Sequence, residues 1–118
     1  MTKDTPAMRL EMRSDPRFLA GARKMVQAVA ERLGFEESES SRVSLAVDEA
    51  LCNIIRHGYD NAADKPIWLS LWPARESDGH PRGIRIVIED EARQVELATI
   101  KSRDLEDIRP HGLGVHII

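Results

Sequence analysis

Apolar residues recur at helical spacing in two consecutive segments of this chain, and this repeat limits the fold more than any other feature. The first segment spans residues 18–33, after a candidate N-cap at Ser14 or Asp15 and with Pro16 in its first turn. Gly34 follows it directly, as a glycine that ends a helix commonly does. The apolar positions are Phe18, Leu19, Ala22, Met25, Val26, Val29 and Leu33. The sequence therefore predicts a helix with one apolar face.

The second segment begins in the Glu/Ser-rich stretch 36–41 and ends at His57-Gly58. Its apolar positions are Val43, Ala46, Val47, Ala50, Leu51, Ile54 and Ile55. We expect Gly58 to be the C′ residue, because a helix commonly ends on a glycine in the left-handed conformation.

Three further segments alternate apolar and polar residues, which is the period of a strand with one buried face. They are residues 7–13, 67–73 and 83–90. The last two are separated by ESDGHPRG, a run of turn-forming residues, so we expect them to pair as an antiparallel hairpin.

The C-terminal part of the sequence is less regular. Residues 91–111 have no sustained period and are predicted to form a long, partly ordered loop, whereas HGLGVHII at 111–118 resembles the start of a helix. The order of elements predicts an α/β (α+β) two-layer sandwich, with the helices on one face of a mixed or antiparallel sheet.

Composition limits the class of protein. A chain of 118 residues is long enough for one domain, and its 17 basic and 20 acidic residues are interspersed, so neither nucleic acid nor an anionic membrane is an expected partner. No apolar run approaches the roughly 20 residues of a membrane span, and the N-terminus has no apolar signal core. Cys52 is the single cysteine, which fits a reducing compartment. We expect a cytoplasmic protein.

Three polar residues lie four positions apart on the second predicted helix: Glu49, Asn53 and His57. This spacing places them in one row beside the apolar face. They fit two interpretations, of which the first is an ordinary solvated helix surface. In the second, the Asn53 amide oxygen binds Mg²⁺ and Glu49 acts as a base toward a nucleophile that attacks phosphate.

The run LAVDEALCNIIRHGY at 45–59 resembles the N-box of the bacterial anti-sigma-factor serine kinases, a branch of the GHKL ATPase superfamily. The resemblance extends over most of the chain, through the predicted hairpin to HGLGVHII, which is similar to a glycine box. It implies a Bergerat-type ATP-binding fold of which residues 1–118 would form one domain, lacking the last helix and strands of the family.

The resemblance also implies roles for individual residues. Glu49 would be the catalytic base, Asn53 the Mg²⁺ ligand, and Asp90 the acceptor for the adenine amino group. Other positions expected to contact the nucleotide are His57, Ala92, Gly112 and Gly114. Arg109, or His111 in its place, is expected to meet the phosphate charge on the basis of its side chain and not of an aligned family arginine. Residues 91–111 would close over the phosphates as a lid.

By this resemblance, the protein would transfer the γ-phosphoryl group of Mg-ATP to a serine or threonine of a small STAS-type anti-sigma antagonist. It would also sequester a sigma factor or a similar regulator, and a homodimer is expected. Ala92 stands where the family normally has glycine, which favours an alternative: a non-catalytic partner-switching module with weak or lost ATP binding. The catalytic half of a sensor histidine kinase is a third hypothesis, disfavoured because no phosphoacceptor helix pair precedes residue 7.

Several other residues invite a functional interpretation. Adjacent helical residues point about 100° apart, so Asp48 is not expected to share a site with Glu49 but to be solvated or paired. Cys52 is expected to be a small core residue, and the spacing of the histidines does not predict a zinc site. Trp68 and Trp72 share the strand face opposite the helices, either packed over the sheet against Arg85 or Val87, or forming a partner surface.

Overall fold

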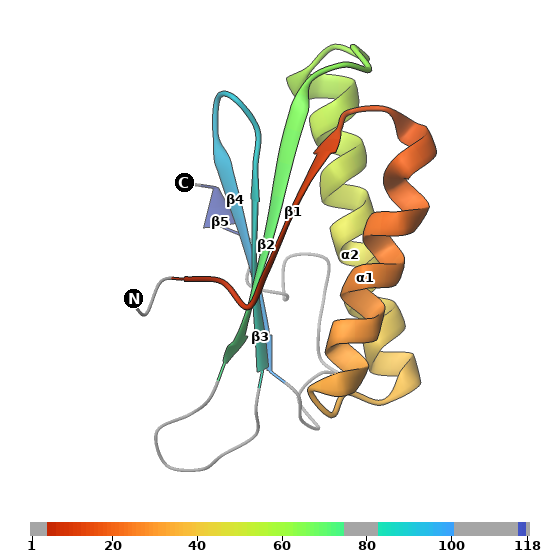
Figure 1. The fold of residues 1–118 in the computed structure, drawn as a ribbon, viewed down its shortest axis with the longest axis vertical. Coiled ribbons are helices and arrows are strands. Elements are labelled where there is room, and N and C mark those ends of the chain that lie inside the picture. Colours follow the sequence, from red (N-terminus) through yellow and green to blue (C-terminus); the bar gives the residue numbers. More distant parts are fainter. Residues whose placement is uncertain (1–4, 75–82, 101–115, 118) are drawn as a thin grey trace.

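The computed structural model describes residues 5–74, 83–100 and 116–117. In these residues two α-helices lie side by side and cover one face of an antiparallel sheet, while the other face is free of helices (Figure 1). The elements in chain order are β1 (Met8–Arg13), a 3-10 turn (Pro16–Phe18), α1 (Leu19–Arg32), α2 (Glu37–Asn53), a π-helix (Ile54–Gly58), β2 (Pro66–Ala74), β3 (Gly83–Glu89), β4 (Gln94–Ile100) and β5 (His116–Ile117). The two-layer prediction is confirmed. No helix in the described part is long and apolar enough to cross a membrane.

The helices begin and end largely where the capping residues predict. The Asp15 side chain accepts a hydrogen bond from the Arg17 backbone N–H at 2.9 Å and so caps the 3-10 turn that leads into α1. Gly34 ends α1 with a φ of 100°, a conformation that side chains disfavour. At the start of α2, the Glu36 N–H donates to Glu39 Oε1 at 2.7 Å, as in a capping box.

The strands follow one another in the order β1-β2-β3-β4-β5, and every described pairing is antiparallel. In β2 and β3, Leu69 pairs with Ile88 and Leu71 with Ile86, so the apolar residues of both strands face the helices. The predicted hairpin is therefore confirmed.

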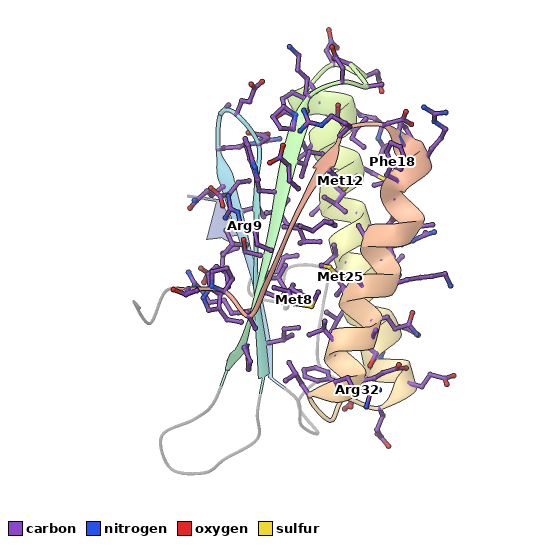
Figure 2. The ribbon with its side chains drawn as sticks, viewed as in Figure 1. Met8, Arg9, Met12, Phe18, Met25 and Arg32 are labelled. Atoms are coloured by element: carbon purple, nitrogen blue, oxygen red, sulfur yellow. The ribbon has the colours of Figure 1, made fainter. Side chains whose placement is uncertain are left out.

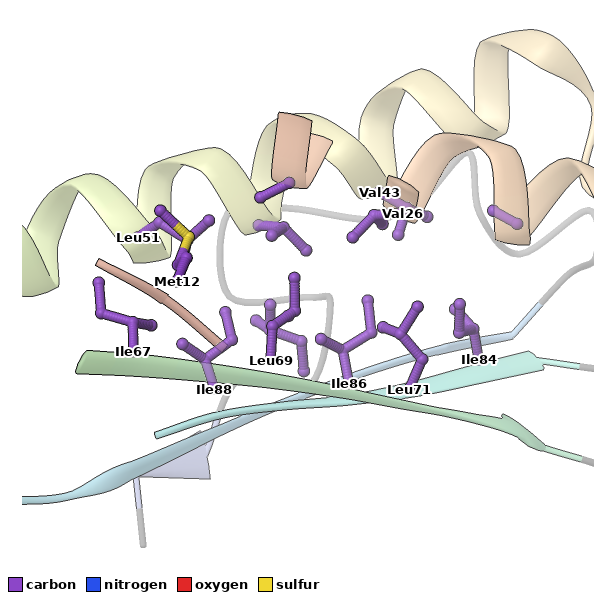
Figure 3. Close-up of a cluster of buried hydrophobic side chains, with 14 of the residues drawn as sticks. Met12, Val26, Val43, Leu51, Ile67, Leu69, Leu71, Ile84, Ile86 and Ile88 are labelled. Carbon is purple, nitrogen blue, oxygen red and sulfur yellow. The ribbon is translucent and has the colours of Figure 1, made fainter. Parts of the chain in front are cut away.

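One core joins the two layers (Figure 3). It contains the inward residues of β2 and β3 and the apolar faces of α1 and α2. Its most buried members are Ile67, Leu69, Leu71, Ile84, Ile86 and Ile88 from the sheet and Val26, Val47, Leu51 and Ile54 from the helical layer. These side chains contribute the main stabilisation of the fold, at about 1.5–3 kcal/mol for each fully buried aliphatic side chain.

The open face of the sheet is covered by its own polar and aromatic side chains. The Arg85 guanidinium lies 4.5 Å from the centre of the Trp72 ring and is paired with Glu96 at 2.9 Å. The Trp68 indole N–H donates to Glu11 Oε1 at 3.1 Å. For Trp72 this agrees with packing over the sheet against Arg85, the first of the two predicted alternatives, whereas Trp68 bonds to β1 instead. Val87 is also buried on this face.

Two predictions for the C-terminal part are wrong. Residues 94–100, assigned to a long loop, form β4, whose Val95 and Leu97 are buried while Glu96 pairs across the open face. The alternation of apolar and polar residues in β4 spans only a few residues between charged segments, which is too short to predict a strand from the sequence. His116–Ile117 form a short strand beside β4, where the sequence suggested a helix. The strand hydrogen bonds available at the edge of β4 explain this difference.

Candidate functional site

The C-terminal end of the N-box helix changes geometry after Asn53. The Tyr59 N–H donates to the Ile54 carbonyl at 2.8 Å, an i→i+5 bond, and residues 54–58 form a π-helix. Gly58 was expected to be the C′ residue in the left-handed region, and this is wrong. Asp60 and Asn61 have that conformation instead, with φ of 54° and 64°. Short polar side chains tolerate it better than most, which explains how the helix ends without a glycine there.

The second part of the site is the turn between β3 and β4, residues 90–93. Asp90 Oδ1 accepts hydrogen bonds from the backbone N–H groups of Ala92 at 2.7 Å and Arg93 at 2.8 Å. The Asp90 N–H donates to the Arg93 carbonyl at 3.0 Å, closing the turn. Asp90 Oδ2 lies 3.5 Å from Arg93 Nε, and the Asp90 side chain is only 2% exposed. The carboxylate is therefore held in one orientation, with Oδ2 free of these backbone donors.

Gly58 and the Asp90 carboxylate are in direct contact across these two parts. A Cβ placed on Gly58 would lie 3.0 Å from Asp90 Oδ2 and 3.5 Å from Arg93 Nη2. Tyr59 adds a second link, because its hydroxyl donates to the Pro66 carbonyl at 2.6 Å and accepts the Glu91 N–H at 2.9 Å. The end of the N-box helix, the start of β2 and the turn after β3 thus form one connected unit.

The row of polar residues on α2 lies at the surface. The side chains of Glu49 and Asn53 are exposed and one helical turn apart, with Asn53 as the last residue of α2. His57 is also exposed but belongs to the π-helix, so it does not continue the α-helical row unchanged. The exposed carboxylate of Glu49 and the exposed amide of Asn53 thus lie on the helix whose C-terminal extension reaches Asp90 through Gly58.

Ala92 does not strain the turn. Its φ is outside the left-handed region, so an alanine in place of glycine is accommodated by the backbone. Its side chain is exposed and its N–H is directed to Asp90. The predicted phosphate contacts Arg109, His111, Gly112 and Gly114 lie outside the described residues, as does most of the predicted lid.

Asp48 is paired, as expected. Its Oδ1 lies 3.7 Å from Arg23 Nη1, on the side of α2 that faces α1, and Cys52 donates its S–H to Asp48 Oδ2 at 3.9 Å. Cys52 is half-buried, where a core position was expected. Burial raises the pKa of the Cys52 thiol, and the negative charge of Asp48 raises it further. These bonds do not connect Asp48 or Cys52 to the turn that carries Asp90.

Three residues of the unit were not predicted to have these contacts: Gly58, Tyr59 and Arg93. Gly58 was assigned to a helix end because glycine is common there, yet its lack of a side chain is needed for the approach of Asp90. Arg93 follows Asp90 by three residues, and this spacing was a usable sign of an ion pair. Tyr59 follows Gly58 in HGY, but a single tyrosine does not reveal which backbone groups it will bind.

A separate groove lies between β1 and α1, with a volume of about 590 Å³. Met12, Phe18 and Met25 are among its lining residues and lie on the side of the molecule where β1 and α1 meet (Figure 2). Of the predicted nucleotide-site residues that the structure describes, none lines this groove.

Comparisons with known proteins identify the family of this chain. The family described as the histidine kinase-like ATPase domain matches residues 12–118. The chain is also similar to the serine-protein kinase RsbW of Halalkalibacterium halodurans, with 23% identity over 109 residues. That alignment covers 86% of this chain and 62% of the relative, so the chain spans less than two thirds of the relative's length.

Proposed function

Because this chain belongs to the family of histidine kinase-like ATPase domains, we propose that it binds ATP beside the Asp90 turn and the end of the N-box helix. One observation carries the proposal: the Asp90 carboxylate is 2% exposed, fixed by two backbone N–H groups, and in contact with Gly58. A carboxylate fixed in this way can accept a hydrogen bond from the amino group of adenine with little loss of conformational freedom.

The side-chain chemistry of the exposed end of α2 supports Mg-ATP as the ligand. Asn53, at the end of α2, would offer its amide oxygen to Mg²⁺, which commonly takes one or two protein oxygens when phosphates supply others. When bound, Mg-ATP supplies the phosphoryl group for transfer. Glu49, one turn before Asn53, would accept the proton of the attacking hydroxyl. His57 and Ala92 would contact the nucleotide, and Arg109, Gly112 and Gly114 would contact its phosphates.

The reaction proposed is transfer of the γ-phosphoryl group to a serine or threonine of a small STAS-type anti-sigma antagonist. Similarity to a serine-protein kinase supports this choice over other reactions of the family. The same domain would sequester a sigma factor or similar regulator, as a homodimer in the cytoplasm. Partner exchange would then depend on the phosphorylation state of the antagonist.

A second candidate function is a partner-switching module with weak or lost ATP binding. The observation that favours it is the ion pair at the proposed adenine site, where Arg93 Nε lies 3.5 Å from Asp90 Oδ2. A nucleotide base must share or replace this contact. Such competition lowers affinity, because part of the interaction energy is spent in breaking the ion pair.

Calorimetry with ATP, in the presence and absence of Mg²⁺, separates the two functions. We expect the full-length protein to bind Mg-ATP, and Asn53→Ala to bind it about tenfold or more weakly while its Mg²⁺-free affinity stays unchanged. No heat and no thermal shift with the wild-type protein would support the module. Equal Mg-ATP affinity of both proteins would remove Asn53 from the site.

A further inference from the structure

We propose that Tyr59 is a positioning residue for nucleotide recognition: its hydroxyl holds the turn that carries Asp90, and so sets the preference for adenine. This inference rests on the proposed ATP site. It adds a residue outside the predicted site and assigns separate roles to the two oxygens of Asp90.

The hydrogen bonds of the Tyr59 hydroxyl have only one possible direction. The Pro66 carbonyl, at 2.6 Å, can only accept, so the hydroxyl must donate to it. The Glu91 N–H, at 2.9 Å, can only donate, so the hydroxyl oxygen must accept. A tyrosine phenol is protonated at neutral pH and so can make both bonds, and burial raises the pKa of Tyr59 further.

This bond links the turn to elements other than β3 and β4, whose paired ends hold it at Glu89 and Gln94. The side chains of Glu91 and Ala92 at its tip are exposed, and the other described bonds of the turn join residues 90–93 with one another. Tyr59 connects the turn to β2 and to the end of the π-helix, two elements anchored in the core. Loss of the hydroxyl would let the turn move relative to Gly58.

Within the turn, the two oxygens of Asp90 have different partners. Oδ1 accepts the N–H groups of Ala92 and Arg93, whereas Oδ2 is next to Gly58 and 3.5 Å from Arg93 Nε. Oδ2 is therefore the oxygen left for a ligand donor. Arg93 is 37% exposed, so its side chain has room to turn aside for a base.

A comparison of an adenine nucleotide with a hypoxanthine nucleotide separates an effect on the position of Asp90 Oδ2 from an effect on nucleotide binding in general. ATP presents an amino group at position 6 of the base, while inosine triphosphate (ITP) presents a carbonyl oxygen there, which a carboxylate repels. The ratio of ATP to ITP affinity thus reports the placement of Oδ2, and a mere loss of stability would not change it.

The test compares Tyr59→Phe with Ser14→Ala in the full-length protein. Ser14 is a matched control, because its buried hydroxyl also donates to a carbonyl (Ala62, 2.5 Å) and accepts a backbone N–H (Lys65, 3.0 Å). None of these Ser14 partners belongs to the Asp90 turn. We expect Tyr59→Phe to reduce the ATP/ITP affinity ratio about fivefold or more, and Ser14→Ala to lower Tm without changing the ratio.

An unchanged ratio in Tyr59→Phe, with Tm lowered as in Ser14→Ala, would overturn the inference and leave the ATP site standing. If the wild-type protein binds neither nucleotide, the proposed function fails, and this inference fails with it. Hydrogen exchange of the Glu91 amide adds a test without nucleotide: it should be faster in Tyr59→Phe and unchanged in Ser14→Ala. Equal protection of Glu91 in wild type and Tyr59→Phe would also overturn the inference.

Discussion

Gly58 lies against the Asp90 carboxylate so closely that a Cβ on Gly58 would be 3.0 Å from Asp90 Oδ2. This contact joins the end of the N-box helix to the end of β3. Tyr59, the next residue, binds the turn that follows Asp90. The proposed ATP site is built on these adjacent contacts, which place a buried acceptor beside the end of a helix that carries exposed Asn53 and Glu49.

Substitution of Gly58 by alanine tests this contact. The new methyl group would press on a carboxylate that two backbone N–H groups hold in place, so we expect a loss of about 1–3 kcal/mol in the free energy of unfolding and weaker ATP binding. Gly21→Ala is the matched control, because a Cβ there has no neighbour within 4 Å and the residue lies within α1. That variant should be stabilised by about 0.5–1 kcal/mol with unchanged ATP affinity. Equal effects at both glycines would argue against a special contact at Gly58.

Glu49→Gln tests the proposed base. The amide keeps the shape of the side chain but cannot take up the hydroxyl proton, so phosphoryl transfer from ATP to a STAS-type antagonist should fall about 100-fold or more. ATP affinity, measured by calorimetry, should be unchanged. Glu37→Gln, an exposed glutamate in the first turn of α2, should transfer at the wild-type rate. Normal transfer by Glu49→Gln would exclude Glu49 as the base.

The pKa of Cys52 gives a prediction that does not depend on ATP. Burial and the Asp48 charge both raise this pKa, so less thiolate is present at any given pH and alkylation by iodoacetamide should become fast only in alkaline solution. Asp48→Asn removes the negative charge and should move the rate profile to lower pH. Asp64→Asn, at an exposed position, is the control. Superimposable profiles for wild type and Asp48→Asn would show that Asp48 does not act on the thiol.

Two leucines of α2 test the placement of the core. Leu51 is fully buried in the core between the helices and the sheet, whereas Leu45 is 56% exposed. We expect Leu51→Ala to lower the free energy of unfolding by about 2–5 kcal/mol, and Leu45→Ala to change it by less than about 0.5 kcal/mol. Urea unfolding measures both. A larger loss at position 45 than at position 51 would mean that α2 presents a different face to the sheet.

The sequence predicted the elements whose patterns are long enough to be unambiguous. α1 and α2, with their buried faces, were predicted from the apolar repeats of residues 18–33 and 43–55. β3 and its buried face were predicted from the alternation through Ile84, Ile86 and Ile88. β4 was not predicted, because its alternation of apolar and polar residues rests on Val95 and Leu97 alone. The strand is defined by its pairing with β3, and a local sequence pattern carries no information on such a contact between strands.

The sequence indicated which residues could form the candidate site but not how they are arranged in space. Glu49 and Asn53 are singled out by their spacing on one helix and by the resemblance, Asp90 by the resemblance alone, and the roles of all three stay predictions. The π-helix after Asn53 was not predicted, since Ile54 and Ile55 continue the apolar face of α2 in a way that suits an α-helix as well. The contact of Gly58 with Asp90 depends on how two distant segments pack, which no spacing within either segment specifies.

Chemical-shift mapping of the isotope-labelled full-length protein with Mg-ATP tests the central claim most directly. We predict that the backbone amides of Gly58, Glu91 and Ala92 shift on addition of Mg-ATP, and that the Asn53 side-chain amide shifts only when Mg²⁺ is present. The Trp68 indole, on the open face of the sheet, should be unaffected. Shifts confined to the groove between β1 and α1, or no shifts at saturating Mg-ATP, would contradict an ATP site beside Asp90.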